Sequence, residues 1–150
     1  MRSFGNVTVM VTDAKAPKAE NVCSFAFTGW YTKETDGPVW WRWSAGGGEI
    51  HIATSKPLEA LMTGEVSSGD PPNSVRVLVN AENEVVIEND SKAPVSIESV
   101  PLHLRAGENV IRFVSRNQGI KIPTGDRVLA IAIGNLQIYA VSGGACLLKP

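Results

Sequence analysis

The sequence is poor in cysteine and histidine, with two of each among 150 residues. Cys23 and Cys146 stand near opposite ends of the chain, and no C-x-x-C pair occurs. A zinc site built from clustered cysteines and histidines is therefore excluded. The two cysteines are expected to be unpaired small hydrophobes, although a disulfide between neighbouring terminal strands of a sandwich stays sterically open.

Neither sign of charge is in excess. The net charge is −1 and the pI is about 6.1, which gives no electrostatic footprint for nucleic acid and no polybasic patch for a membrane surface. No apolar run approaches the ~20 residues that span a bilayer, so we expect no membrane span. Residues 1–6 lack an apolar h-region, so no secretory signal is expected. A cytoplasmic chain and a piece cut from a larger protein both remain open.

Helical periodicity is missing as well. No window keeps apolar residues at i, i+3, i+4 and i+7 for more than about two turns. Alternation with period 2 recurs instead, and Gly, Pro and Asn clusters separate the alternating segments. About nine or ten strands at 8–12-residue intervals predict an all-β, antiparallel β-sandwich in a single domain over residues 1–150. The clearest strands are expected at 7–12, 39–44, 49–53, 74–80, 84–88, 109–115 and 128–133.

The segment 39–44 contains three of the four tryptophans. On a strand, Trp41 and Trp43 share one face, and Trp40 shares the other with Arg42. We expect Trp41 and Trp43 in the core, and the opposite face packed under a loop or presented to a ligand. The glycines at 46–48 suit a tight hairpin that pairs the next strand back on this one.

Two further local features are predicted. In 49–53, Ile50 and Ile52 are expected to face the core and His51 to face away. The apolar positions between 95 and 104 change parity near residues 98–99, which predicts a β-bulge or a short loop there. Gly107 suits a turn position with positive φ, and Asn109 is expected to close that turn by hydrogen bonds to nearby backbone.

The second half of the chain carries a longer pattern, Leu102-x-Leu104-x-x-Gly107-x-Asn109-x-Ile111-x-Phe113-x-Ser115 and then Pro123-x-Gly125-Asp126-Arg127-x-Leu129-Ala130-Ile131-x-Ile133. With the W-x-W strand at 41–43 and the segment 48–53, it resembles a galactose-binding-like jelly-roll domain. The version it resembles is the accessory β-sandwich attached to bacterial glycosyltransferases and related polysaccharide enzymes. The resemblance covers about residues 25–140, and residues 1–20 are expected to add a strand and a loop. The pair Asp126-Arg127 is expected to anchor the long loop 116–127.

Residues able to carry catalysis are few. His51 and His103 are predicted on strands, and no G-x-S-x-G elbow, phosphate loop or dinucleotide fingerprint accompanies them. No two carboxylates are marked as a facing pair. We therefore expect no enzyme activity of the chain alone and no cofactor. A structural calcium ion is implied by the resemblance, but Asp13, Asp36 and Asp70 are isolated and give it no motif.

Carbohydrate binding asks for other residue types. Sugar C–H faces stack on aromatic rings, and polar neighbours take the hydroxyl groups. The natural ligand-binding set is Trp30, Tyr31, Trp40 and Arg42, with Asp36 and Asn117 as hydroxyl partners. These residues predict a non-catalytic carbohydrate-binding or accessory domain whose partners are an oligosaccharide or polysaccharide and an adjacent catalytic domain.

A structural or protein-interaction sandwich without glycan affinity, such as a docking module or a virion component, remains the alternative, and buried tryptophans would favour it. Self-association through exposed edge strands such as 7–12 also stays open.

Overall fold

The computed structural model describes residues 23–123 and 125–141, and within these ranges the chain forms strands and no helix. The predicted strand at 7–12 lies outside the described residues, as does Cys146 and with it the question of a disulfide. The strands are β1 (Cys23–Thr28), β2 (Glu34–Asp36), β3 (Val39–Ser44), β4 (Gly47–Thr54), β5 (Leu58–Ser68), β6 (Asn73–Val79), β7 (Asn83–Asn89), β8 (Val95–Leu104), β9 (Gly107–Ser115), β10 (Ile120–Lys121), β11 (Val128–Leu129) and β12 (Ile131–Ala140).

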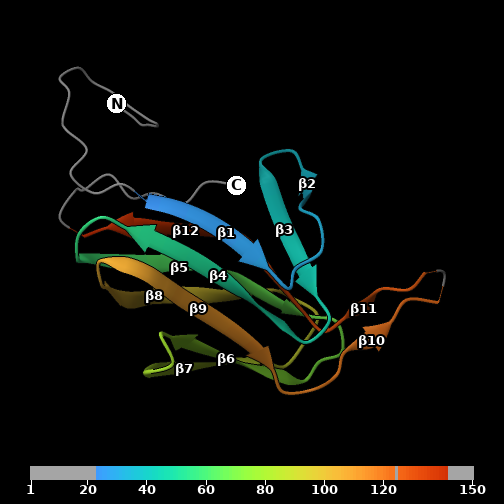
Figure 1. Ribbon diagram of the computed structural model, residues 1–150. Coiled ribbons are helices and arrows are strands. Elements are labelled where there is room, and N and C mark those ends of the chain that lie inside the picture. Colours follow the sequence, from blue (N-terminus) through green and yellow to red (C-terminus); the bar gives the residue numbers. More distant parts are fainter. Residues whose placement is uncertain (1–22, 124, 142–150) are drawn as a thin grey trace.

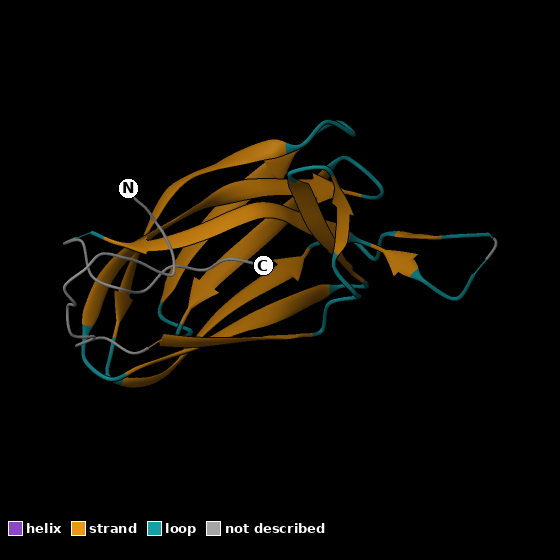
Figure 2. Cartoon of the chain, turned by 90° about the horizontal axis from the view of Figure 1, so that it is seen from above, coloured by secondary structure: helices purple, strands orange, loops and turns teal. Residues whose placement is uncertain are grey.

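Two five-stranded antiparallel sheets pack face to face (Figure 1). Sheet I has the order β1-β4-β9-β6-β7, and sheet II has the order β2-β3-β12-β5-β8. Apart from the β6–β7 hairpin, each step along the chain from β3 to β9 changes sheet, which is the jelly-roll arrangement. The predicted all-β jelly-roll sandwich is confirmed. The small β10–β11 hairpin projects from one end of the sandwich, as Figure 2 shows from above.

The core lies between the two sheets and follows the alternation of the strands. In β4, Ile50 and Ile52 are fully buried while His51 faces out, as predicted. Ile111 and Phe113 of β9 fill the same layer and are also fully buried. Burying each such side chain contributes about 1.5–3 kcal/mol relative to leaving it exposed.

The predicted hairpin between β3 and β4 is wrong. These strands belong to different sheets, so the chain crosses the sandwich at this point. The Ser44 hydroxyl accepts hydrogen bonds from the backbone N–H of Gly46 (3.3 Å) and of Gly47 (2.8 Å), and it donates to the carbonyl of Gly47 (2.6 Å). Gly47 has a φ of 146°, and a Cβ there would lie 2.2 Å from the carbonyl oxygen of Phe113. The glycines therefore serve a crossing between sheets and not a tight turn within one.

Of the two alternatives predicted near residues 98–99, a bulge and a short loop, the structure shows the bulge, within β8. The β5–β8 register shifts between Met62 and Gly64, which pair with Val100 and Ile97 respectively. One residue of β5 thus faces residues 98–99 of β8, and this extra residue carries the apolar side chains from one parity to the other.

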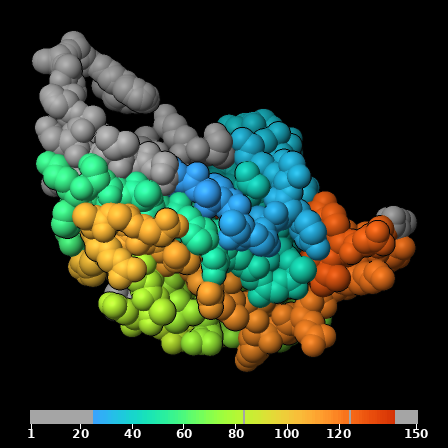
Figure 3. Space-filling model, in the orientation of Figure 1, coloured from blue at the N-terminus to red at the C-terminus, as the bar shows by residue number. Residues whose placement is uncertain are grey.

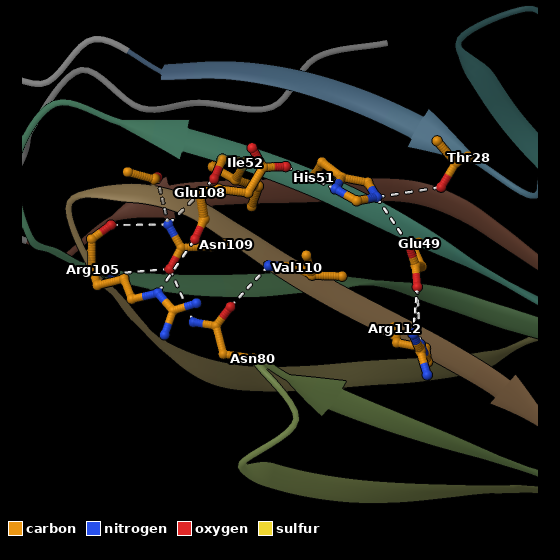
Figure 4. Close-up of polar contacts among 11 residues, drawn as sticks. Thr28, Glu49, His51, Ile52, Asn80, Arg105, Glu108, Asn109, Val110 and Arg112 are labelled. Carbon is orange, nitrogen blue, oxygen red and sulfur yellow. Dashed lines mark hydrogen bonds and ion pairs between the residues drawn. The ribbon is translucent and has the colours of Figure 1, made fainter.

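Asn109 closes the β8–β9 turn as predicted, with Gly107 at a φ of 96°. Its side chain is fully buried. The amide nitrogen donates to the carbonyls of Ile52 (3.2 Å), Arg105 (3.0 Å) and Gly107 (3.2 Å). The amide oxygen accepts from the N–H of Arg105 (3.0 Å) and from the side chain of Asn80 (3.0 Å), as Figure 4 shows. One side chain therefore joins β4, the β6–β7 turn and β9.

Replacing Asn109 by alanine should destabilise the fold by about 3 kcal/mol, because the backbone groups of Ile52, Arg105 and Gly107 lose a side-chain partner. Chemical denaturation followed by fluorescence measures this change. Gln137→Ala, at an exposed position of β12, is the control and should change the free energy of unfolding by less than about 0.5 kcal/mol. Equal effects of the two variants would contradict the assigned role of Asn109.

Candidate functional site

The structure reverses the expected orientation of the tryptophan strand. Trp40 is 7% exposed and belongs to the core, whereas Trp41 and Trp43 are half-buried on the outer face of sheet II. The assignment of Trp41 and Trp43 to the core was wrong for this reason. The backbone N–H of Trp40 donates to the side-chain oxygen of Asn135 (3.2 Å), which ties β3 to the irregular part of β12.

Trp30 is held from three sides by the protein. Its ring meets Phe113 edge to face, with centroids 5.7 Å apart and an interplanar angle of 74°. Its indole N–H donates to the carbonyl of Glu49 (3.2 Å). A Cβ at Gly48 would lie 2.4 Å from the ring, so Gly48 makes room for it. Trp30 therefore acts as a packing residue that covers one end of the core.

Tyr31 and Arg42 fix the segment between β1 and β2 through hydrogen bonds and contacts between guanidinium groups and aromatic rings. The guanidinium of Arg42 lies 4.6 Å from the ring centroid of Phe27, and it donates to the carbonyl of Tyr31 (3.2 Å). The hydroxyl of Tyr31 accepts from the N–H of Val128 (3.2 Å), and the guanidinium of Arg127 lies 4.7 Å from the tyrosine ring centroid. These contacts position both residues for packing.

Arg127 anchors its loop, but with a different partner from the one expected. Its guanidinium pairs with the carboxylate of Glu34 in β2 at 3.0 Å. Asp126 is exposed and has no ion-pair partner among residues 23–123 and 125–141.

The two residues predicted to bind hydroxyl groups lie in different settings. Asp36 is exposed at the end of β2. The side-chain nitrogen of Asn117 donates to the carbonyls of Asp70 (2.9 Å) and Pro72 (3.3 Å), and its oxygen accepts from the N–H of Gly119 (2.8 Å). Asn117 thus holds two loops together. Ligand binding by the six predicted residues stays a prediction, and the positions of Trp30 and Trp40 weaken it.

The outer face of sheet II offers an arrangement that the sequence did not single out. Trp41 pairs with Gly134 of β12 and Glu34 of β2, and Trp43 pairs with Ala132 of β12. Beyond Gly134, the next residue in the same row is Glu65 of β5. We call this set the tryptophan face: Glu34, Trp41, Trp43, Glu65, Ala132 and Gly134. Period 2 shows that Trp41 and Trp43 share a face, but no signal in the sequence shows which face is covered.

A second arrangement, the polar strip, lies on the outer face of sheet I. Thr28, Glu49 and Arg112 stand side by side on β1, β4 and β9, the strands that face the viewer in Figure 3. The carboxylate of Glu49 accepts from Arg112 at 2.7 Å and 3.0 Å and meets Nε2 of His51 at 2.9 Å. Nδ1 of His51 meets the carboxylate of Glu108 at 2.9 Å (Figure 4). These five residues define the strip.

Each charged group of the polar strip stabilises the charged form of its neighbour. Hydrogen bonding to Glu108 is the main cause that raises the pKa of His51, Glu49 adds to it, and desolvation opposes it. Hydrogen bonds from Arg112 and then from His51 lower the pKa of Glu49. Both ring nitrogens of His51 face carboxylates at 2.9 Å, which stabilises the imidazolium form, and an imidazolium cannot act as a general base. The hydroxyl of Thr28 is 3.4 Å from Nε2, but that nitrogen already faces Glu49, so the strip is an ion-pair network and not a nucleophile with its base.

Metal-binding side chains do not gather in the part of the chain that the structure describes. No three His, Cys, Asp or Glu residues within it are placed to hold a metal ion. The same ranges contain no helix that could cross a membrane.

Comparison with known proteins finds similar solved structures and no similar sequence family. No family model and no curated protein matches the chain. Among solved structures, it is similar to the Podospora anserina GH26-CBM35 β-(1,4)-mannanase, with 14% identity, a TM-score of 0.46, and coverage of 89% of this chain and 29% of that one. It is also similar to the exo-β-1,3-galactanase of Phanerochaete chrysosporium, with 20% identity, a TM-score of 0.41, and coverage of 77% and 29%.

A third similar structure is a smaller protein. The CBM35 from Cellvibrio japonicus Abf62 shares 11% identity at a TM-score of 0.41, over 82% of this chain and 99% of that one. The chain therefore spans less than a third of the mannanase and of the galactanase but nearly the whole of this module. Each likeness concerns the fold alone.

The environments of the tryptophans predict how they respond to a quencher. Because Trp41 and Trp43 are only half-buried and the carboxylate of Glu65 lies in the same row, the cationic quencher caesium should reach both indoles. The double variant Trp41→Phe/Trp43→Phe should therefore lose most of the quenchable emission. The matched variant Trp40→Phe should keep it, and the opposite pattern would show that the faces are assigned the wrong way round.

The polar strip predicts a pH-dependent stability. The pKa of His51 is raised above 6.5 in the folded chain, so its stabilisation is full below that pH and is lost as the pH rises through the folded pKa. The pKa of Glu49 is lowered below 4.5, so its share is present above that pH and is lost on acidification through the folded pKa. The melting temperature of His51→Gln should fall furthest below wild type between about pH 5 and 6.5.

Thermal melts of wild type and His51→Gln across pH 4 to 9 measure this window. Glu108→Gln serves as the control, because removing the main cause of the raised pKa should flatten the pH dependence. A wild-type advantage that is the same at every pH would contradict the assignment.

Proposed function

We propose that the chain is a non-catalytic carbohydrate-binding domain and that the tryptophan face of sheet II binds the glycan. One observation carries the proposal. Trp41 and Trp43 are half-exposed on alternate positions of β3, on the outer face of a sheet whose neighbouring positions are glycine and alanine. Solvent-accessible indoles in a row are the groups that stack on sugar rings.

The spacing of the two indoles suits a chain of sugars. Alternate residues of a strand are about 6.6 Å apart, so Trp41 and Trp43 can contact neighbouring units of one glycan. Gly134 and Ala132 have no long side chain to rise beside the rings. Neither indole N–H has a hydrogen-bond partner among the described residues, and both are therefore available as donors to hydroxyl groups.

The charges around the indoles favour a neutral glycan. The carboxylate of Glu65 has no ion-pair partner within the described ranges, and Asp36 at the end of β2 is exposed. Only Glu34 is neutralised, by Arg127. Free carboxylates accept hydrogen bonds from sugar hydroxyls and repel acidic sugars. We therefore infer that neutral polysaccharides bind more tightly than uronic acid polymers.

The same proposal gives the domain an accessory role beside a glycan-active catalytic domain. It rests on the sequence pattern at 102–133 and on the W-x-W strand, which resemble accessory sandwiches of polysaccharide enzymes. In that role the domain holds the polymer near the active site, and the chemistry belongs to the neighbouring domain.

Removing either indole should weaken glycan binding by roughly ten-fold, because a stacking contact contributes about 1–1.5 kcal/mol. Affinity electrophoresis in gels with neutral or uronic acid polysaccharides, followed by calorimetry on those that retard the chain, measures Trp41→Ala and Trp43→Ala. Val86→Ala is the control, since Val86 is exposed on the outer face of sheet I.

Two results would argue against this function. Unchanged affinity in both tryptophan variants would remove the tryptophan face as the binding site. A wild-type chain that no polysaccharide retards would favour a protein-interaction domain that uses the same half-exposed indoles.

A further inference from the structure

A shallow groove lies on the outer face of sheet I, next to the crossing between β3 and β4. Its volume is about 380 Å³. Thr28 and Gly29 at the end of β1 line one side, Arg112 and Val114 of β9 line the other, and the glycines 46–48 lie between them. Gly46 is exposed, Gly47 is half-buried and Gly48 is buried against the ring of Trp30, so no side chain rises between the two sides of the groove.

The polar side chains on one side of the groove are held in place by hydrogen bonds to one another. Nε and Nη2 of Arg112 both donate to Oε2 of Glu49, at 3.0 Å and 2.7 Å. Oε1 of Glu49 is held by His51 at 2.9 Å, so the carboxylate is fixed from both ends. The remaining Nη1 of Arg112 has no partner within residues 23–123 and 125–141. The side chain of Arg112 is 58% exposed, and its free edge is open to a ligand.

The balance of charge in the groove points to the class of ligand. The charged residues that line the groove are Arg112 and Glu49, and they form an ion pair at 2.7 Å, so the lining carries no net charge. A site of this kind has no electrostatic preference for a cation or an anion. It does present donors and acceptors side by side, which match neighbouring hydroxyl groups, since each hydroxyl donates one hydrogen bond and accepts others.

We propose that this groove is a second carbohydrate site, which takes a single neutral hexopyranose through hydrogen bonds from its hydroxyls to Arg112, Glu49 and Thr28. It lies on the other sheet from the tryptophan face and binds without aromatic stacking. The site is therefore independent of the proposed function and has a different preference. It selects the hydroxyls of one sugar unit, such as a chain end, whereas the tryptophan face contacts successive units.

The test uses two-dimensional ¹H–¹⁵N NMR, because one spectrum reports on both faces. The full chain is titrated with methyl α-galactopyranoside, methyl α-mannopyranoside and methyl β-glucopyranoside, up to about 100 mM each, since a site of a few hydrogen bonds binds in the millimolar range. The amides of residues 46–49 report the groove, and the indole N–H signals of Trp41 and Trp43 report the other face.

Saturable shifts of the groove amides with at least one glycoside are expected. Arg112→Lys and Thr28→Val should each weaken that binding by about ten-fold, because a charge-assisted or hydroxyl hydrogen bond is lost. Arg76→Lys is the matched control, since Arg76 forms a similarly exposed ion pair with Glu84 on the same face, at 2.7 Å. Trp41→Ala should leave the groove shifts unchanged. The spectra themselves show that each variant is folded.

Three outcomes would overturn the second site. They are an absence of groove shifts with all three glycosides, equal weakening by Arg76→Lys, and shifts confined to the indole signals. The last of these would leave the tryptophan face standing as the glycan site. Groove shifts in a chain that no polysaccharide retards in affinity electrophoresis would instead support the second site and count against the proposed function.

Discussion

The crossing of the chain between the two sheets at Ser44 decides how the rest of the structure is used. β3 belongs to sheet II and β4 belongs to sheet I, so the short segment between them connects the two sheets. The Ser44 hydroxyl and the strained backbone of Gly47 hold the chain in this crossing. The crossing turns Trp40 into the core and leaves Trp41 outside, and it opens the glycine-lined groove on the opposite sheet.

Buried amides hold the ends of the sandwich in the same way. Asn73 donates to the hydroxyl of Ser115 and accepts from the N–H of Asn117, while Asn89 donates to the carbonyls of Val66 and Ala93. With Asn109 at the other turns, each joins segments that are distant in the sequence. A buried amide left unpaired is costly. These side chains therefore specify which loops meet, whereas the apolar core specifies only that the two sheets pack.

What the sequence predicts correctly is local, and what it misses depends on partners across the sheet. Period 2 is enough to place Ile50 and Ile52 inside, and the parity change near residues 98–99 is enough to predict a bulge or a short loop there. Parity also pairs Trp41 with Trp43, but the side that is covered depends on which sheet β3 joins. A glycine run is compatible with a hairpin and with a crossing, so the hairpin predicted there was wrong. The core assignment of Trp41 and Trp43 rested on the usual burial of tryptophan in small sandwiches, which does not decide between the two faces of a strand.

The two outer faces present different groups to solvent, and the core keeps them apart. On sheet II the indoles have uncommitted N–H groups, and the nearby carboxylate of Glu65 is unpaired among the described residues. The glycan binding proposed there would therefore use groups that the fold does not need. On sheet I, Glu49 is already paired with His51 and Arg112, so these side chains are held in place before any ligand arrives. The affinity of the ligand proposed there would come from the small entropy cost of ordering these side chains and not from a new ion pair. Because the packed core separates the faces, a substitution on one face should leave the other intact, so the two proposed sites can be tested independently.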